Sequence, residues 1–235
     1  MPFTTPSFPL TRVGLTAGAL FFLLLSSGPK AETLTNAIAG SARVVDGDTL
    51  DVSGQRIRLE GIDAPELAQS CKDAQGADWP CGREALKYLA ELTSGRDVAC
   101  DSTGTDKYGR VLGICFAEGR EINAEMVRSG FAWAFIKYST AYTSQEAEAR
   151  AVRAGVWQGP AEAPWDYRHK GWQTAEASAP NGCAIKGNVS HNGRIYHVPW
   201  APWYSKVKVD ENRGERWFCS EADALAAGWR AAATN

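Results

Sequence analysis

An α+β fold is predicted for residues 42–167 by three observations. Residues 42–62 alternate apolar and polar side chains, as three consecutive antiparallel strands do. Residues 96–116 read as a strand, a loop and a second strand. Helical patterns lie between and after these strands, at residues 82–95, 122–130 and 144–157. Five short strands with three helices favour a small Greek-key barrel of the OB type.

Local signals support these elements in turn. Two dipeptides that favour turns, Asp46-Gly47 and Ser53-Gly54, separate the first three strands. The first and second helical patterns end in Gly95 and Gly130, and the third opens with Ser144 as its expected N-cap. The apolar face of the first helix is formed by Ala85, Leu86, Leu89 and Leu92.

A second, smaller segment follows. Residues 168–182 lose periodicity and gather small and polar side chains, so they are predicted to be a linker. Residues 183–232 are aromatic and closed by their own cysteines, which predicts a small module in which Ser220 caps a short helix. Its aromatic and basic side chains either form the module core, the interpretation that we favour, or present a surface to nucleic acid. They are His191, Arg194, His197, Trp200, Trp203, Tyr204, Lys206 and Lys208.

The first 39 residues have the pattern of an export signal. Arg12 precedes an uncharged run at residues 13–28, and a small-residue cleavage site follows at residues 37–39. Cleavage there would leave Gly40 as the first residue, and a cut after Ala31 is the other option. An uncleaved membrane anchor is the alternative. Both interpretations predict a secreted or periplasmic protein, attached to a membrane only if the leader is uncleaved.

The six cysteines fit a disulfide framework, as expected of an exported chain. Fifteen pairings are possible for six cysteines. Proximity in the sequence favours Cys71 with Cys81, Cys100 with Cys115, and Cys183 with Cys219. Zinc ligation is the competing interpretation, but the chain has no C-x-x-C pair and its histidines lack the spacing of finger ligands.

The charge of the chain argues against a binder that depends on its overall field. From Gly40 onward the sequence has 23 basic and 26 acidic residues, a formal charge of −3. Proteins that grip nucleic acid by counterion release are usually basic. Action on a polyanion must therefore rest on a local group of residues or on a metal ion.

Three charged clusters lie at predicted strand ends or loops, and each has a structural interpretation beside a functional one. In the first, Asp46 and Asp48 flank a hairpin turn, and Asp48 also offers a carboxylate oxygen to a hard cation. In the third, TDKYGR (105–110), Arg110 either closes a loop or presents a planar fork to phosphate oxygens.

The second cluster, RLEGIDAPE (58–66), offers a second carboxylate oxygen. Arg58 and Asp63 are an odd number of positions apart, so a regular strand would point them to opposite faces. A bulge at Gly61 would break the alternation and allow both side chains to face the same side. The structural interpretation is that Asp63 forms a turn in the loop after the strand. Pro65 keeps Ala64 extended and so fixes the direction of Glu66.

Together the three clusters resemble the staphylococcal nuclease-like (thermonuclease) family in order and spacing. The resemblance covers residues 42–158 approximately and continues through NAEMVRSGFA (123–132) to Gly155-Val156-Trp157. It implies a five-stranded OB-fold barrel with three helices for residues 40–167. It also implies Ca²⁺-dependent hydrolysis of phosphodiester bonds in DNA and RNA, leaving 3′-phosphates.

The resemblance also implies roles for individual residues. Asp48, Asp63 and the carbonyl of Ala64 match the Ca²⁺ ligands of the family, and Asp46 lies beside them. Arg58 and Arg110 match two phosphate-binding arginines. Glu66 matches the carboxylate that acts as general base.

The nucleotide pocket departs from the family pattern. Tyr108 and Tyr138 match pocket tyrosines, but Ile136 stands where the family has another tyrosine. The neighbouring Phe131, Trp133 and Phe135 are interpreted as packing residues. The lost tyrosine affects base stacking and not the chemistry.

Two functions follow from these observations. The first is an exported, monomeric Ca²⁺-dependent nuclease that acts on DNA and RNA, with no protein partner implied. The alternative is a non-catalytic OB-type module that binds nucleic acid or a cell-envelope polymer. The presence of both arginines, the glutamate and both metal aspartates favours the enzyme.

Overall fold

The computed structural model of this chain describes residues 1, 2, 4 and 37–232. The predicted leader run at residues 13–28 lies outside them. From Ala37 onward the described residues belong to one compact unit. Among the described residues, none of the helices has the length and apolar character needed to cross a membrane.

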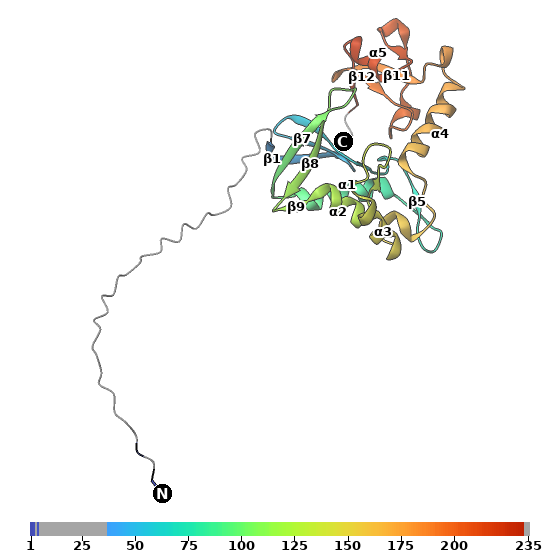
Figure 1. The fold of residues 1–235 in the computed structure, drawn as a ribbon. Helices are drawn as coiled ribbons and strands as arrows, with labels where there is room; N and C mark the ends of the chain where they lie inside the picture. Colours follow the sequence, from blue (N-terminus) through green and yellow to red (C-terminus); the bar gives the residue numbers. More distant parts are fainter. Residues whose placement is uncertain (3, 5–36, 233–235) are drawn as a thin grey trace, which may run out of the picture. The chain divides into compact units, whose positions relative to one another are not determined.

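The predicted five-stranded barrel is confirmed. Five strands, in the order β3-β2-β1-β7-β8, form a closed ring because β3 also pairs with β8, in parallel, and the short β9 pairs with β8 as a sixth strand outside the ring. In Figure 1, β7 and β8 form a long hairpin beside the other strands. The strands are β1 (Ala37–Asp46), β2 (Thr49–Val52), β3 (Gln55–Leu59), β7 (Asp97–Thr105), β8 (Val111–Ala117) and β9 (Arg120–Glu121).

The alternation seen in the sequence is what fills the barrel. Leu50 and Val52 in β2, like Ile57 and Leu59 in β3, are buried at every second position. Strand β1 begins at Ala37 and pairs with β7 from that residue onward. A cut after residue 39 would therefore remove the first three residues of this strand.

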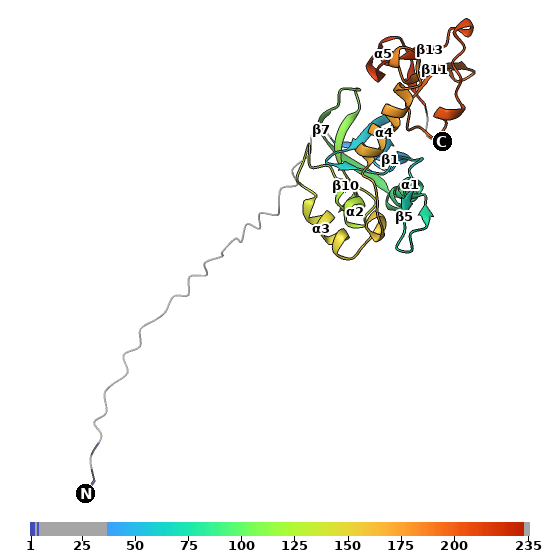
Figure 2. The same ribbon diagram turned by 90° about the vertical axis from the view of Figure 1, so that its right-hand side faces the viewer.

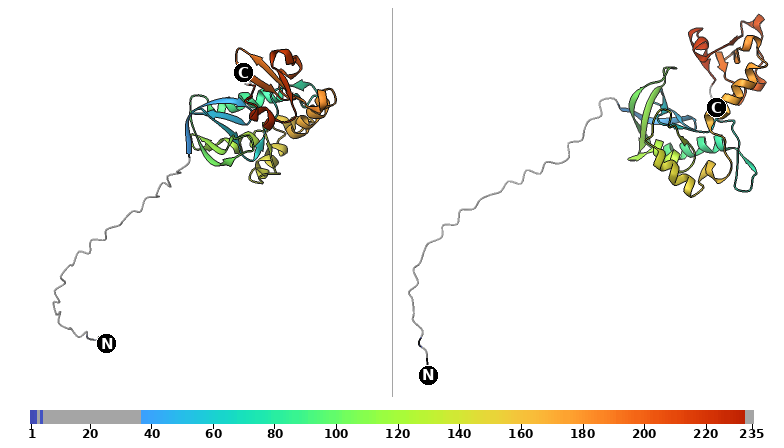
Figure 3. Two further views of the ribbon diagram at one scale, coloured as in Figure 1. Left: turned by 90° about the horizontal axis from the view of Figure 1, so that it is seen from above. Right: turned by 45° about the vertical axis from the view of Figure 1, so that its right-hand side comes forward.

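Three helices cover the barrel at one side, as Figures 1 and 2 show and Figure 3 repeats in two further views. Ala85 and Leu89 of α1, with Met126 and Val127 of α2, join the barrel residues in one core. The predicted helices are thus present with shifted ends. They are α1 (Cys81–Thr93), α2 (Ile122–Arg128) and α3 (Thr143–Ala151), which is followed by the 3₁₀ turn η1 (Gly155–Gln158).

The predicted N-cap at Ser144 is wrong. Helix α3 begins at Thr143, and Tyr142 holds the N-cap position without a side-chain cap. The ring of Tyr142 is buried and its hydroxyl donates to Glu121 at 2.7 Å. This tertiary contact sets the start of the helix, while the Ser144 hydroxyl donates to Gln145 instead.

Short strands and the disulfides complete this part of the chain. Strand β4 (Ile62–Asp63) pairs with β10 (Trp133–Ala134), and β5 (Cys71–Lys72) pairs with β6 (Asp78–Trp79). All six cysteines are described, and they pair as predicted from sequence proximity, which rules out zinc ligation by thiolates. The bonds join Cys71 with Cys81, Cys100 with Cys115, and Cys183 with Cys219.

The segment predicted to be a linker is helical over most of its length. Helix α4 (Pro164–Glu176) starts with a proline in its first turn, which suits a helix start, and the 3₁₀ turn η2 (Pro180–Gly182) follows. Trp165 of α4 packs with the cluster around the Cys71–Cys81 bond, whereas Trp172 packs against the C-terminal core. Because its aromatic residues serve two cores, the helix lacks one apolar stripe, and periodicity could not reveal it.

The C-terminal module has its own small core. Its sheet has the order β13-β11-β12-β14. Ser220 caps α5 as predicted, since its hydroxyl oxygen accepts from the Asp223 N–H at 3.1 Å. The elements are β11 (Ile185–Ser190), β12 (Gly193–His197), η3 (Tyr204–Lys206), η4 (Glu211–Arg213), β13 (Arg216–Phe218), α5 (Glu221–Ala226) and β14 (Arg230–Ala231).

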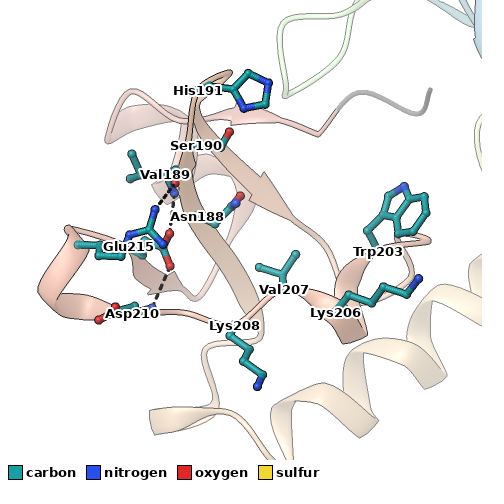
Figure 4. Close-up of a pocket in the computed structure, with 11 residues that line it drawn as sticks. Asn188, Val189, Ser190, His191, Trp203, Lys206, Val207, Lys208, Asp210 and Glu215 are labelled. Atoms are coloured by element: carbon teal, nitrogen blue, oxygen red, sulfur yellow. Dashed lines mark hydrogen bonds between the residues drawn. The ribbon is translucent and has the colours of Figure 1, made fainter.

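The aromatic and basic side chains of the module divide between the two interpretations. Tyr204 is a packing residue, because its hydroxyl donates to the Ala184 carbonyl at 2.6 Å. Trp203 is 49% exposed, and the Lys206 ammonium lies 4.6 Å from its ring centroid. Trp203, Lys206 and His191 line an open pocket of about 710 Å³. Figure 4 shows these side chains.

Candidate active site

The first part of the site is the turn between β1 and β2. The Asp46 carboxylate accepts from the Asp48 N–H at 3.2 Å, which fixes the turn. The Asp48 carboxylate in turn accepts from the Ala64 N–H at 2.8 Å. Gly47 permits this approach, since a Cβ at that position would lie 2.7 Å from the Ala64 Cβ. Two segments that are distant in the sequence are thereby joined at the metal residues predicted above.

The second part is the stretch from Arg58 to Asp63. Strand β3 ends at Leu59, and Gly61 then takes a φ of +75° beneath the ring of Tyr142, where a Cβ would lie 2.8 Å from a ring carbon. This interruption brings Arg58 and Asp63 together, with 2.8 Å between the Arg58 Nη2 and the Asp63 Oδ1. The Arg58 guanidinium also contacts the Asp48 carboxylate. One partly buried arginine therefore bridges the two predicted metal aspartates.

Glu66 is held at its backbone by Gln69. The Gln69 side-chain oxygen accepts from the Glu66 N–H at 3.1 Å, and the Gln69 N–H donates to the Glu66 carbonyl at 2.7 Å. Gln69 is 1% exposed, and its amide also donates to the Glu162 carbonyl at 2.7 Å. Sequence reasoning missed Gln69, although its place three residues after Glu66 suits a loop-closing role.

Burial perturbs two of the site carboxylates. Burial raises the pKa of Glu66 to about 7, although the charge and hydrogen bond of Arg168 oppose the shift. Burial also raises the pKa of Asp46, opposed by the charges of Arg58 and then Arg110. Arg110 therefore acts on the site electrostatically, while its Nε donates to Asp106 at 2.7 Å.

Arg168 was not predicted as a site residue. Its Nη1 lies 3.1 Å from Asp63 Oδ1 and 2.7 Å from Glu66 Oε1, and its Nη2 lies 2.8 Å from Asp63 Oδ2. It comes from α4, more than a hundred residues after its partners. The proline and the acidic first turn of this helix indicate a helix start, but no sequence signal connects it with Asp63.

Of the predicted nucleotide-pocket residues, Tyr108 lies beside Arg110 and Tyr138 is exposed. The Arg110 guanidinium lies 5.5 Å from the Tyr108 ring centroid, and Tyr138 is 69% exposed. Their role in base stacking stays a prediction. The packing interpretation is confirmed for Trp133, which is 4% exposed, and for Phe135, whose ring stacks on Trp165 with centroids 5.5 Å apart.

The donor set fits a hard cation. Asp48 and Asp63 supply carboxylate oxygens and Ala64 supplies a backbone carbonyl, which are the ligand types that Ca²⁺ takes. In the described residues no group of three or more His, Cys, Asp or Glu side chains is arranged to hold a metal. Water and a substrate phosphate would therefore have to complete the coordination, as a six- to eight-coordinate oxygen site permits.

Comparison with known proteins agrees with this geometry. Residues 56–159 match the family of staphylococcal nuclease homologues. Protein ParB of Escherichia coli is 34% identical over 172 residues, which cover 66% of this chain and 89% of that protein. The chain belongs to the staphylococcal nuclease family. It is a phosphodiester-hydrolysing endonuclease.

Other similarities extend this picture. The micrococcal nuclease of Shigella flexneri is 37% identical, over 54% of this chain and 77% of that protein. The succinoglycan biosynthesis protein ExoI of Rhizobium meliloti (strain 1021) is 39% identical, over 53% of this chain and 67% of that protein. Residues 161–231 match a second family, described as ArfC, so Arg168 lies outside the nuclease match.

Gly82 provides a test of how closely α1 supports the loop at residues 66–69, which carries the predicted general base Glu66. A Cβ at Gly82 would overlap the carbonyl group of Glu66, and the Gly82 N–H donates to the Gln69 carbonyl at 3.3 Å. We expect Gly82→Ala to displace the loop and to lower the DNA cleavage rate at least about tenfold, because small misplacements of catalytic groups are costly.

The matched control is Gly171→Ala, where the nearest atom to a Cβ is 3.9 Å away. Its cleavage rate should equal that of the wild type in the same plasmid assay. Full activity of Gly82→Ala would show that the loop does not depend on this close packing.

Proposed function

We propose that this nuclease is exported and cleaves DNA and RNA in a Ca²⁺-dependent reaction that leaves 3′-phosphate ends. The observation that carries the proposal is the convergence of Arg58, Asp48, Asp63 and Glu66 around one point. Together they provide a guanidinium, two oxygen ligands and a base, which hydrolysis of a phosphodiester requires. The 3′-phosphate product and the Ca²⁺ dependence rest on membership of the family.

Charge neutralisation is the first requirement of this reaction. A phosphodiester is anionic and repels an attacking water, so cations must face its oxygens. Arg58 is 13% exposed at the side chain, and a guanidinium removed from water interacts more strongly with developing charge. Arg110 is the second arginine expected to contact phosphate. Ca²⁺, when bound at Asp48, Asp63 and the Ala64 carbonyl, would act as a Lewis acid on a phosphoryl oxygen.

Proton transfer is the second requirement. The Glu66 side chain is 23% exposed, so a water molecule can approach its carboxylate. Its backbone is held by Gln69, which limits the directions in which the side chain can point. We assign Glu66 as the group that accepts the proton of the attacking water.

Export is supported by the cysteines as well as by the predicted leader. All six cysteines are in disulfides, and such bonds persist in oxidising compartments rather than in a reducing cytosol. The secreted or periplasmic location expected from residues 1–39 is consistent with this pairing.

A plasmid digestion tests the metal and the product together. We expect relaxation and fragmentation of supercoiled DNA with Ca²⁺ and no cleavage with EGTA, since charge neutralisation requires the cation. The ends should resist tailing by terminal transferase until a phosphatase removes the 3′-phosphate. Cleavage at the same rate in EGTA would refute the Ca²⁺ dependence, and direct tailing would refute the product assignment.

A further inference from the structure

The guanidinium of Arg168 occupies the oxygens that the cation and the attacking water would use. It forms a bidentate ion pair with Asp63, at 3.1 and 2.8 Å, and donates a third hydrogen bond to Glu66 at 2.7 Å. The Asp63 side chain is fully buried and that of Arg168 is 24% exposed. Bidentate pairs of this kind are among the stronger charge-assisted hydrogen bonds. A cation that takes up Asp63 has to replace part of this contact.

Helix α4 holds Arg168 in place from both sides. Trp165, three residues earlier, stacks on Phe135 with the ring planes 7° apart. Trp172, four residues later, packs against the core of the C-terminal module. The position of the guanidinium therefore depends on contacts of the nuclease domain and of the module together.

We propose that Arg168 sets the metal affinity of the nuclease site by competing with Ca²⁺ for Asp63 and by pairing with Glu66. In this arrangement the segment that carries the second family match restrains the nuclease, and binding of the cation displaces the arginine from its carboxylates. The inference rests on the proposed Ca²⁺ dependence. It differs from a phosphate-binding role, in which Arg168 would face the substrate and would leave Ca²⁺ affinity unaffected.

Calorimetric titration of Ca²⁺ into the full chain tests this inference directly. Arg168→Gln should bind Ca²⁺ about tenfold more tightly than the wild type, because hydrogen bonds to a charged group are each worth about that factor or more. Lys170→Gln is the matched control, since Lys170 lies on the same helix, is exposed and pairs with the Glu162 carboxylate at 2.7 Å rather than with Asp63 or Glu66. Its Ca²⁺ affinity should match that of the wild type.

Thermal unfolding provides a second readout. Without Ca²⁺, Arg168→Gln should unfold at a lower temperature than the wild type, because Glu66 loses its ion-pair partner and Asp63 keeps only Arg58. With saturating Ca²⁺ its melting temperature should rise by more than that of the wild type, since ligand stabilisation follows affinity. If this variant fails to fold, Arg168→Lys decides the question, because it keeps the charge but removes the two-pronged contact. It should still bind Ca²⁺ more tightly than the wild type.

Unchanged or weaker Ca²⁺ binding by the folded variants would overturn the inference. If DNA cleavage fell at the same time, Arg168 would instead bind phosphate. Failure of the proposed function looks different. In that case the wild type itself would neither bind Ca²⁺ nor require it for cleavage.

Discussion

Replacement of Glu66 by glutamine is expected to lower the rate of DNA cleavage by about 10²–10⁴-fold, the usual contribution of a general base. Glutamine has nearly the same shape but cannot accept the proton of the attacking water. The backbone contacts with Gln69 do not involve the Glu66 carboxylate, so the loop should keep its position. The measurement is single-turnover cleavage of a labelled oligonucleotide at saturating Ca²⁺.

The matched control for this substitution is Glu84→Gln. Glu84 pairs with Lys87 on the surface of α1 at 2.7 Å, and such pairs contribute little. Its cleavage rate should equal that of the wild type. If Glu66→Gln cleaved within twofold of the wild type, another group would have to be the base. Circular dichroism and DNA affinity measured with both variants separate a chemical defect from a folding defect.

Replacement of the buried Asn123 by alanine is expected to produce the largest loss of stability. The Asn123 amide donates to the carbonyls of Glu60 and Gly113, at 3.0 Å each. Its oxygen accepts from the Cys115 N–H at 3.0 Å. Asn123 is fully buried, so alanine would leave the Glu60 carbonyl and the Cys115 N–H without this partner, whereas the Gly113 carbonyl would keep its bond from the Glu60 N–H at 2.9 Å.

We expect Asn123→Ala to reduce the free energy of unfolding by about 3 kcal/mol or more, at about 1–3 kcal/mol for each unsatisfied buried group. At about 2–4 °C per kcal/mol for a chain of this size, the melting temperature should fall by roughly 6–12 °C. Asn192→Ala, at an exposed hairpin turn, is the control and should change stability by less than about 0.5 kcal/mol. A loss below 1 kcal/mol for Asn123→Ala would mean that water or a rearrangement satisfies the freed groups.

Asn123 also helps to hold the turn that positions the candidate active site. Its bond to the Glu60 carbonyl lies next to Gly61, whose turn brings Arg58 against Asp63. Activity of Asn123→Ala should therefore decline below its melting temperature as well. The sequence placed Asn123 within a family motif but gave it no role, because a hydrogen bond over 63 residues leaves no local pattern.

The strands and disulfides were predictable because their signals are local. Alternation of apolar and polar residues reports which face of a strand is buried, and a D-G or S-G dipeptide reports a turn. Each cysteine forms its disulfide with the cysteine that proximity in the sequence favoured, and Cys100 lies opposite Cys115 on neighbouring strands. The break at Gly61 was likewise visible, since only glycine suits the φ of +75° found there.

Two local predictions failed where tertiary contacts outweighed local preference. Ser144 is a good N-cap residue, but the buried Tyr142 determines where α3 begins. The segment at 168–182 was predicted to be a linker, yet α4 extends to Glu176 because Trp165 and Trp172 are packed in two different cores. A helix whose apolar residues face two different cores does not show a single apolar stripe in its sequence.

The sequence by itself determined the barrel and the disulfides and pointed to the residues that we propose for the chemistry, because these depend on side-chain alternation, on cysteine spacing and on three short motifs. Only the tertiary structure decided what faces those residues. Arg58 bridges Asp48 and Asp63, and Arg168 reaches Asp63 and Glu66 from a helix that follows the nuclease domain. Contacts between charges so far apart along the chain arise when separate segments fold against one another, and no pattern within either segment records them.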